Sequence, residues 1–339
     1  MGTSTGRGRG AKGPATGSGV RLHVVTGKGG TGKTTVAAAL ALALAGEGRK
    51  ILLIEVEGRQ GFAQLFDVPP LPYEERKVAV ASRGGDLFAL AVDPESALLE
   101  YLDMYYRLGR AGKALKKVGM FEFATTVAPG ARDVLLTGKA YEAVRRREAD
   151  GTPRYDAVVL DAPPTGRITR FLNVNSEVAG LAKVGPIRRQ ADSIMDLLRS
   201  PRTAVHLVTM LEEMPTQETI DGVVELTAAG LPVGAVIVNM VRPTLMRQTD
   251  LQAARRGTLD TAAITADLRT AGLGAAAGLA HALATDAAGY AERIALEKQE
   301  RRQLRGIERP VLELPYLYDG IDLSGLYELA DRLHDEGAV

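Results

Sequence analysis

The sequence has no cysteine, and this absence excludes several kinds of site. Without thiols the chain cannot form a disulfide framework, a thiolate metal site, a redox pair or a cysteine nucleophile. An excess of charge is lacking too, because 42 basic and 41 acidic residues leave a formal net charge of +1. No global field would attract nucleic acid. We therefore expect no nucleic-acid partner.

Long hydrophobic runs are also missing. The longest, residues 36–45, has half of the roughly 20 residues that span a bilayer, and it follows a polar loop, which predicts a buried helix. The first nineteen residues contain seven glycines and no apolar periodicity, which predicts a disordered tail. No apolar stretch follows its basic residues, as a secretory signal would require. We expect a cytoplasmic protein; peripheral attachment to a membrane stays open.

Residues 20–339 are expected to form one α/β domain. Short apolar segments without polar alternation recur along them, separated by helical stretches, which predicts a doubly wound, mostly parallel sheet. In such sheets ligands bind beyond the carboxyl ends of the strands. The expected strands are 22–25, 51–54, 87–92, 157–160, 204–209, 234–238 and 311–314. Helical inserts are expected at about 94–128, with Asp93 as N-cap, and at 174–202, and further helix at 251–295.

A glycine-rich segment follows the first expected strand and precedes a helix. It fits the pattern G-x-x-x-x-G-K-[ST] of a P-loop, ending in Lys33 and Thr34. Backbone N–H groups of such a loop form an anion cradle that side chains on the glycines would crowd. The residues of this loop are Gly27, Gly29, Gly30, Thr31 and Gly32. Lys33 is expected on the β and γ phosphates of ATP, and the Thr34 hydroxyl on Mg²⁺.

A second lysine, Lys28, follows the first glycine of the loop. It adds a cation that would neutralise charge developing in phosphoryl transfer; a solvated loop lysine is the alternative. The segment GKGGTGKTT resembles the deviant P-loop of ATPases that dimerise around nucleotide, in which this lysine reaches the phosphates of the partner subunit. That resemblance implies a dimer.

The fourth expected strand lies within the segment YDAVVLDAPPTG, residues 155–166. Asp161, at its carboxyl end, is where a Walker B carboxylate would hold Mg²⁺ through water. Gly166 is expected to let a loop approach the γ-phosphate and move on hydrolysis.

Several segments together resemble one family. The segment DAPPTGRITRFL is similar to switch II of the arsenical-pump ATPase family, which also contains the tail-anchored-protein targeting ATPases. The segments GKGGTGKTT, ILLIEVEG, IVNM and ELPY follow in the order of the family, from about residue 21 to the C-terminus. More narrowly, EVEGRQGFAQLFDVPPLPY and FATTVAPGARDVLLTGK resemble one subunit of the paired actinobacterial ATPases of this family.

The resemblance implies four further roles. Asn239 matches the asparagine that reads adenine, and Pro315 begins the loop that packs against the base. Thr35 would bind the α-phosphate region. Glu57 occupies the position of the switch I aspartate that orients the attacking water.

The sequence also departs from the family pattern. Where switch I of the family reads D-P-A-H-S, residues 57–61 read EGRQG. The extra methylene of Glu57 moves its carboxylate by about 1 Å, which costs roughly 10²-fold in rate if nothing compensates. Arg167 replaces the usual switch II histidine, and both a phosphate ligand and an interdomain salt bridge remain open. The arsenite site of the pump and the zinc clasp of the targeting factors both need thiolates, which this chain lacks.

These observations favour a Mg²⁺-dependent switch ATPase that works as a homodimer, or as a heterodimer with a paralogous subunit. Its helical inserts would form a surface for a client or a membrane partner such as a channel. Two alternatives stay open. One is the energising subunit of an anion efflux system, and the other is a weakly hydrolysing, nucleotide-binding regulatory subunit of a hetero-assembly.

Overall fold

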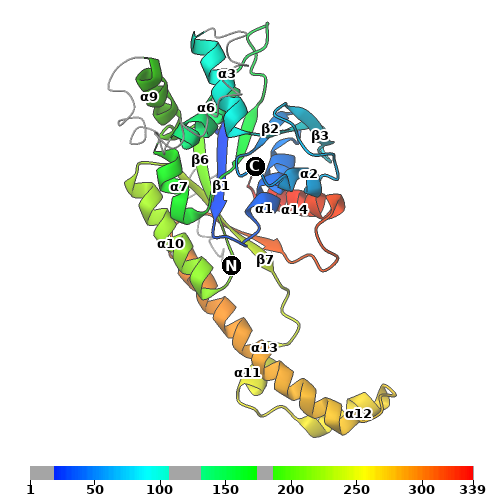
Figure 1. The fold of residues 1–339 in the computed structure, drawn as a ribbon. Coiled ribbons are helices and arrows are strands. Elements are labelled where there is room, and N and C mark those ends of the chain that lie inside the picture. The colour runs from blue at the N-terminus through cyan, green and yellow to red at the C-terminus, as the bar shows by residue number, and fades with distance from the viewer. Residues whose placement is uncertain (1–18, 107–130, 174–185, 339) are drawn as a thin grey trace, which may run out of the picture.

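An eight-stranded sheet forms the centre of the molecule (Figure 1). The computed structural model describes residues 19–106, 131–173 and 186–338. The strands lie in the order β3-β4-β2-β5-β1-β6-β7-β8, and within these residues every pairing is parallel except β3 with β4. Their bounds are β1 Leu22–Gly27, β2 Lys50–Glu55, β3 Arg76–Val80, β4 Asp86–Ala91, β5 Ala157–Asp161, β6 Thr203–Thr209, β7 Val233–Val241 and β8 Val311–Pro315. The doubly wound α/β prediction is confirmed.

All seven predicted strands are present, and β3 is the strand that the sequence pattern did not indicate. It is an antiparallel edge strand with the sequence RKVAV, and none of its five residues is buried. Edge strands carry charges that discourage pairing with other chains. Because β3 has no continuous apolar run, it lacks the signal that marks the buried parallel strands.

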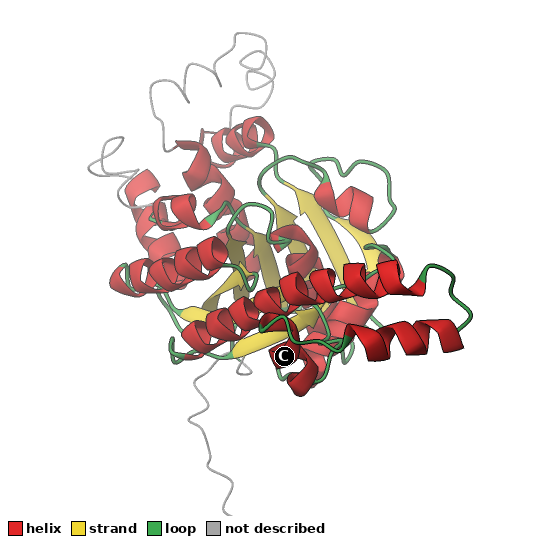
Figure 2. Cartoon of the chain, turned by 90° about the horizontal axis from the view of Figure 1, so that it is seen from below, coloured by secondary structure: helices red, strands yellow, loops and turns green. Residues whose placement is uncertain are grey.

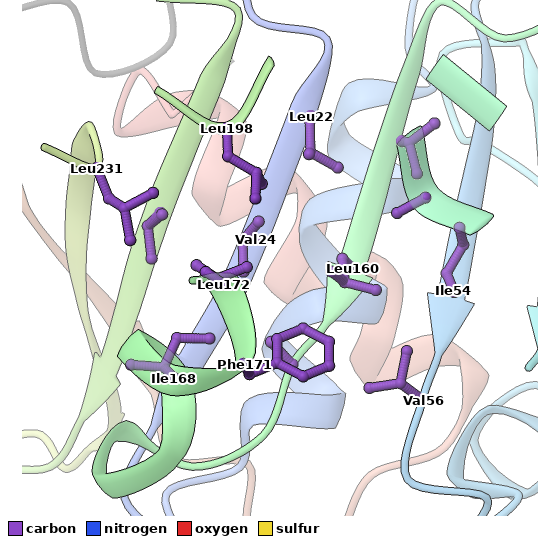
Figure 3. Packing of buried hydrophobic residues seen from close by; sticks show 14 of the residues in the cluster. Leu22, Val24, Ile54, Val56, Leu160, Ile168, Phe171, Leu172, Leu198 and Leu231 are labelled. Carbon is purple, nitrogen blue, oxygen red and sulfur yellow. The ribbon is translucent and has the colours of Figure 1, made fainter. Parts of the chain in front are cut away.

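Helices cover both faces of the sheet (Figure 1). One face packs against α1 Lys33–Leu44, α2 Gly61–Leu65 and α14 Leu323–Asp335. The other packs against α6 Ala131–Arg145, α7 Thr165–Leu172, α9 Pro186–Leu198 and α10 Glu213–Ala228. Successive residues of β1 alternate between the two cores, with Val24 in one and Val25 in the other. Figure 3 shows Val24 with Leu160 of β5 and with Ile168 and Phe171 of α7.

The predicted buried helix is α1, in which every residue from Val36 to Leu44 is buried, as is Ala45 after it. It lies between the sheet and α14, so it is apolar on all sides rather than along one stripe. Its burial holds the preceding loop in place at the carboxyl end of β1.

One helix is described within the first predicted insert. Helix α3, Pro94–Tyr106, is capped by Asp93, whose Oδ2 accepts a hydrogen bond of 2.8 Å from the Ser96 amide. In the second insert, helix α9 buries Ala191, Ile194 and Met195 in the core. The remainder of both predicted inserts, 107–128 and 174–185, lies outside the described residues, as does the predicted tail over 1–18.

The alanine-rich region forms an arm that extends away from the sheet. Its helices are α11 Gln248–Arg255, α12 Thr261–Thr270 and the 30-residue α13 Ala276–Arg305. Figures 1 and 2 both show α12 lying alongside the outer part of α13. A small separate cluster, which includes Leu251 and Ile294, joins α11 to α13. Within the described ranges, no helix combines the length and the apolar character that crossing a bilayer requires.

Candidate nucleotide-binding site

Apart from Asn239 of β7 and Pro315 of β8, the predicted site residues gather at the carboxyl ends of β1, β2 and β5. In the sheet register Val25 of β1 and Glu55 of β2 are both paired with Asp161 of β5. Because the three strands are parallel neighbours, the segments that follow them meet at one edge of the sheet. The P-loop follows β1, the loop of residues 57–61 follows β2, and the segment leading into α7 follows β5.

Two glycines of the P-loop are fixed by close contacts. A Cβ on Gly27 would lie 2.1 Å from the carbonyl oxygen of Val208 in β6. Gly32 has a φ of 83°, and a Cβ there would lie 2.4 Å from Nδ2 of Asn239. Any larger residue would displace the loop from β6 or from Asn239. Gly29 and Gly30 have open space around them, as expected of backbone that faces a ligand.

The end of the loop leaves donors available for an anion. Helix α1 begins at Lys33, and its N-cap, Gly32, has no side chain to bond the first-turn N–H groups, which include those of Thr34 and Thr35. The Thr31 hydroxyl donates to the Lys28 carbonyl over 2.8 Å, and Nζ of Lys33 lies 3.4 Å from the same oxygen. Burial lowers the pKa of Lys33, and the charges of Asp161 and Glu57 oppose that shift. The loop therefore presents an ammonium group and unpaired N–H groups, which fit the phosphates of a nucleotide.

The residues predicted to bind Mg²⁺ lie together. The Thr34 hydroxyl donates to Oδ2 of Asp161 over 2.7 Å. Asp161 is 7% exposed, and its Oδ1 has no hydrogen-bond partner in the described part of the chain. Burial raises the pKa of Asp161 to about 7, although the hydrogen bond from Thr34 and the charge of Lys33 oppose the shift. An unsatisfied, buried carboxylate oxygen beside a phosphate cradle fits the chemistry of a Mg²⁺ ion reached through water.

Glu57 lies in the loop after β2, half-buried, with Oε2 3.6 Å from Nε of Arg59. Its charge raises the pKa of Lys33 and that of Asp161. Both effects place its carboxylate within electrostatic reach of the P-loop.

A second acid of the same segment was missed from the sequence. Glu55, the last residue of β2, is 2% exposed, and its Oε1 accepts a hydrogen bond of 3.3 Å from the Gly61 amide. Its Oε2 has no partner within the described residues. The available signal was an acidic residue directly after the apolar run ILLI, but that run indicated packing alone.

Lys28 is held within its own chain. Its Nζ lies 2.5 Å from Oε1 of Glu218 in α10, and Oε2 of Glu218 accepts a hydrogen bond of 3.3 Å from the Thr165 hydroxyl. Thr165 is the first residue of α7, so a single carboxylate connects the P-loop to the segment after β5. Gly166 is the second residue of α7; it is exposed, and a Cβ added there would have open space around it. The structure thus places Gly166 in the first turn of a helix, where the sequence had indicated a loop.

A cavity of about 240 Å³ lies beside the P-loop, lined by residues of β7, α13 and the segments after β6 and β8. Asn239 lines it, and its Nδ2 donates to the carbonyl oxygen of Thr31 over 2.9 Å. The guanidinium carbon of Arg242 lies 4.3 Å from the centroid of the Tyr316 ring. Pro315 ends β8 and directs Tyr316 into this wall. A flat ring, a guanidinium group and an amide beside a phosphate cradle suit a nucleotide base.

Comparisons with known proteins identify the family of this chain. The sequence profile of the anion-transporting ATPases matches residues 20–201. Over 290 residues the chain is 52% identical to ATPase BagA of Mycobacterium tuberculosis, covering 86% of this chain and 85% of BagA. A Mycobacterium bovis protein named as an ATPase matches to the same extent. Over 188 residues, 46% of this chain and 54% of the relative, it is 26% identical to ATPase GET3 of Kluyveromyces lactis. The chain therefore belongs to the anion-transporting ATPase family, as its motifs predicted.

Proposed function

We propose that this protein is a Mg²⁺-dependent ATPase that hydrolyses ATP at the carboxyl edge of its sheet and uses the nucleotide state to change its contacts with a partner. The observation that carries the proposal is the meeting of three groups. These are the uncapped N-terminus of α1, the half-buried Lys33 and the Thr34–Asp161 pair with its unsatisfied carboxylate oxygen. Each suits one part of a magnesium–nucleotide complex.

Each residue then has a defined task. The P-loop N–H groups and Lys33 bind the β and γ phosphates, with Thr35 near the α phosphate. Thr34 and Asp161 hold Mg²⁺, which when bound neutralises negative charge on the phosphates. Glu57 accepts a hydrogen bond from the attacking water, whose oxygen bonds to the γ-phosphorus as the bond to the leaving ADP oxygen breaks.

The cavity beside the P-loop takes the base. Asn239 uses one amide hydrogen on Thr31, which leaves its second N–H and its Oδ1 to pair with adenine. The Arg242–Tyr316 pair supplies a flat wall next to the loop that Pro315 begins. This division of the asparagine amide between loop and base would couple base binding to the position of the phosphate cradle.

In the resting state of the proposed switch, Lys28 is paired with Glu218 of its own chain. To reach the phosphates of a partner subunit, its ammonium group must leave Glu218, which also contacts the start of α7 through Thr165. ATP-dependent dimerisation, with a second copy or a paralogue, would then compete with the Lys28–Glu218 pair and change the setting of α7. Gly166, in that first turn, would give the segment room to approach the γ-phosphate.

One alternative has a specific observation in its favour. Glu57 is longer than the aspartate of the family pattern and lies beside Arg59, which fits a regulatory subunit that binds ATP and hydrolyses it slowly. An energising role in anion efflux would need a thiol-free anion site, since the chain has no cysteine. The helical inserts are the proposed surface for a client or channel.

Titration calorimetry and single-turnover hydrolysis test the proposal. Wild-type protein should bind Mg·ATP, and Lys33→Ala should lose that binding because it removes the half-buried ammonium group of the P-loop. Lys77→Ala is the matched control, because Lys77 pairs with Asp86 at the sheet edge away from the P-loop. Absence of ATP binding by the wild type would refute the proposal. If the wild type hydrolyses ATP and Glu57→Gln does not, the enzyme is favoured over the regulatory subunit.

A further inference from the structure

We propose that Glu55 is a second acidic acceptor for the hydration shell of the bound Mg²⁺ and that it couples the metal to the loop of residues 57–61. This inference rests on the nucleotide site proposed above, but it assigns a role to a residue that neither the P-loop pattern nor the family's switch motifs include. The resemblance places the acid of switch I at Glu57, two residues further along.

Glu55 and Asp161 are neighbours because their strands pair in the sheet. They are paired in register at the carboxyl ends of two adjacent parallel strands, β2 and β5. Side chains at paired positions of parallel strands project from the same face. Both are nearly inaccessible, at 2% and 7% exposure. Two acids are thus buried side by side at the edge where the P-loop begins.

The two carboxylates have four oxygens, and the described residues satisfy only two of them. Oε1 of Glu55 receives the Gly61 N–H, and Oδ2 of Asp161 receives the Thr34 hydroxyl. Oε2 of Glu55 and Oδ1 of Asp161 are buried without a partner in that part of the chain. A buried charged acceptor without a partner is costly. Both oxygens therefore lack donors among the described residues. Because the two carboxylates are neighbours, one ligand could supply donors to both.

A hydrated Mg²⁺ ion meets that requirement. Mg²⁺ keeps several waters and is bound through one or two carboxylates together with substrate phosphates. The described residues contain no group of three or more His, Cys, Asp or Glu that could hold a metal unaided. Two acids, one threonine hydroxyl and nucleotide phosphates fit an ion that binds with its waters and with the nucleotide.

The other oxygen of Glu55 provides the coupling. Gly61 is the first residue of α2, directly after the loop that contains Glu57. A Cβ on Gly61 would lie 2.9 Å from Cγ2 of Thr34, so this end of the loop packs against the threonine that faces the metal. Glu55 therefore has one oxygen toward the metal side and one on the loop. Metal binding would fix the carboxylate and, through it, the Gly61 amide.

Glu55→Gln isolates the metal function. The amide oxygen of glutamine still accepts the Gly61 N–H, while its NH₂ replaces the unpartnered oxygen by a donor that a metal-bound water cannot use. The measurement is the Kd of ADP by titration calorimetry, with Mg²⁺ and with EDTA. We expect the Mg²⁺ enhancement of affinity to fall by about 10-fold, as for other groups that position metal ligands. Glu74→Gln, which removes an exposed acid with the same change in charge, should leave the enhancement unchanged.

The outcomes separate the two proposals. Mg²⁺-dependent binding in the wild type with an unchanged enhancement in Glu55→Gln overturns this inference alone, and would mean that the two acids share a proton instead. Wild type that binds no ADP under either condition overturns the proposed function and this inference with it.

A second measurement needs no variant. Hydrogen exchange of the Gly61 amide in wild-type protein with ADP is compared with Mg²⁺ and with EDTA. Protection should rise with Mg²⁺, because the ion fixes the acceptor of that amide. Equal exchange in the two conditions would overturn the coupling.

Discussion

A buried pair of histidines on two neighbouring strands of the sheet should make the fold sensitive to mild acid. His23 of β1 and His206 of β6 are each 1% exposed, and their rings stack with centroids 5.3 Å apart. The Ala235 amide donates to Nδ1 of His206 over 3.2 Å, so the proton of a neutral His206 is on Nε2. That Nε2 lies 3.1 Å from Nδ1 of His23, to which it donates. Both rings are therefore neutral in the folded state.

Protonation of either ring would be unfavourable in this position. Burial lowers the pKa of His206 to about 4, and burial together with His206 lowers the pKa of His23 well below 6.5. The unfolded chain therefore binds more protons than the folded chain below pH 6.5. The stabilisation is fully present above pH 6.5 and is lost as the pH falls toward 4. The pKa of His206 is about 2.5 pH units lower in the folded chain than its ordinary value of 6.5. At about 1.4 kcal/mol per pH unit, protonation of His206 would lower the free energy of unfolding by about 3 kcal/mol.

Asp161 acts in the opposite direction over much of the same range. Its pKa is raised to about 7, so the folded state gains its proton first and becomes more stable as the pH falls from 7 to 3.8. The pH profile of wild-type protein alone would therefore mix the two effects. A comparison with a histidine variant removes the contribution of Asp161, because it is the same in both proteins.

The variant His206→Asn keeps an acceptor for the Ala235 amide and removes the ring that titrates. Urea unfolding of both proteins, followed by circular dichroism at intervals from pH 7.5 to 4, gives the free energy of unfolding at each pH. The wild type's advantage over the variant should shrink by about 3 kcal/mol between pH 6.5 and 4. Two profiles that remain parallel over this range would refute the assignment of the acid sensitivity to His206.

Three further predictions concern single contacts. Gly32→Ala should weaken ADP binding by about 10-fold or more, since its Cβ would meet Nδ2 of Asn239 at 2.4 Å; Gly278→Ala, in open space on α13, is the calorimetric control. Glu218→Gln should lower the Kd of an ATP-dependent dimer by up to about 5-fold for each Lys28–Glu218 pair that opens, because a partly exposed ion pair contributes at most about 1 kcal/mol. Sedimentation velocity tests this, with Glu225→Gln of the same helix as control, and an unchanged Kd would contradict it. Asp93→Ala should lower the free energy of unfolding by about 1 kcal/mol, because it removes the cap of α3; urea midpoints equal to wild type would contradict that role.

Whether a strand could be predicted from the sequence depended on how deeply it is buried. The seven predicted strands are mostly sealed between two helical layers, so each reads as an apolar run that needs no knowledge of its neighbours. β3 lies at the edge and contains Arg76 and Lys77, and its register with β4 shifts between Lys77 and Ala79. An irregular, charged edge strand has neither the apolar run nor the strict alternation that marks a strand in a sequence. Its place beside β4 depends on pairing, which the local pattern does not contain.

The candidate site also contains features set by a local sequence pattern and features set by contacts between distant segments. The P-loop could be predicted because its glycines, Lys33 and Thr34 act within nine consecutive residues, where spacing alone determines geometry. Other contacts join distant segments: Asn239 bonds Thr31 from 208 residues away, and Lys28 meets Glu218 across 190. Glu55 is the clearest case. Its pairing with Asp161 requires β2 to lie next to β5, a neighbour set by the doubly wound strand order. The acid at the end of this apolar strand can be proposed as an acceptor for metal-bound water only when the adjacent strand is known to end in a second acid.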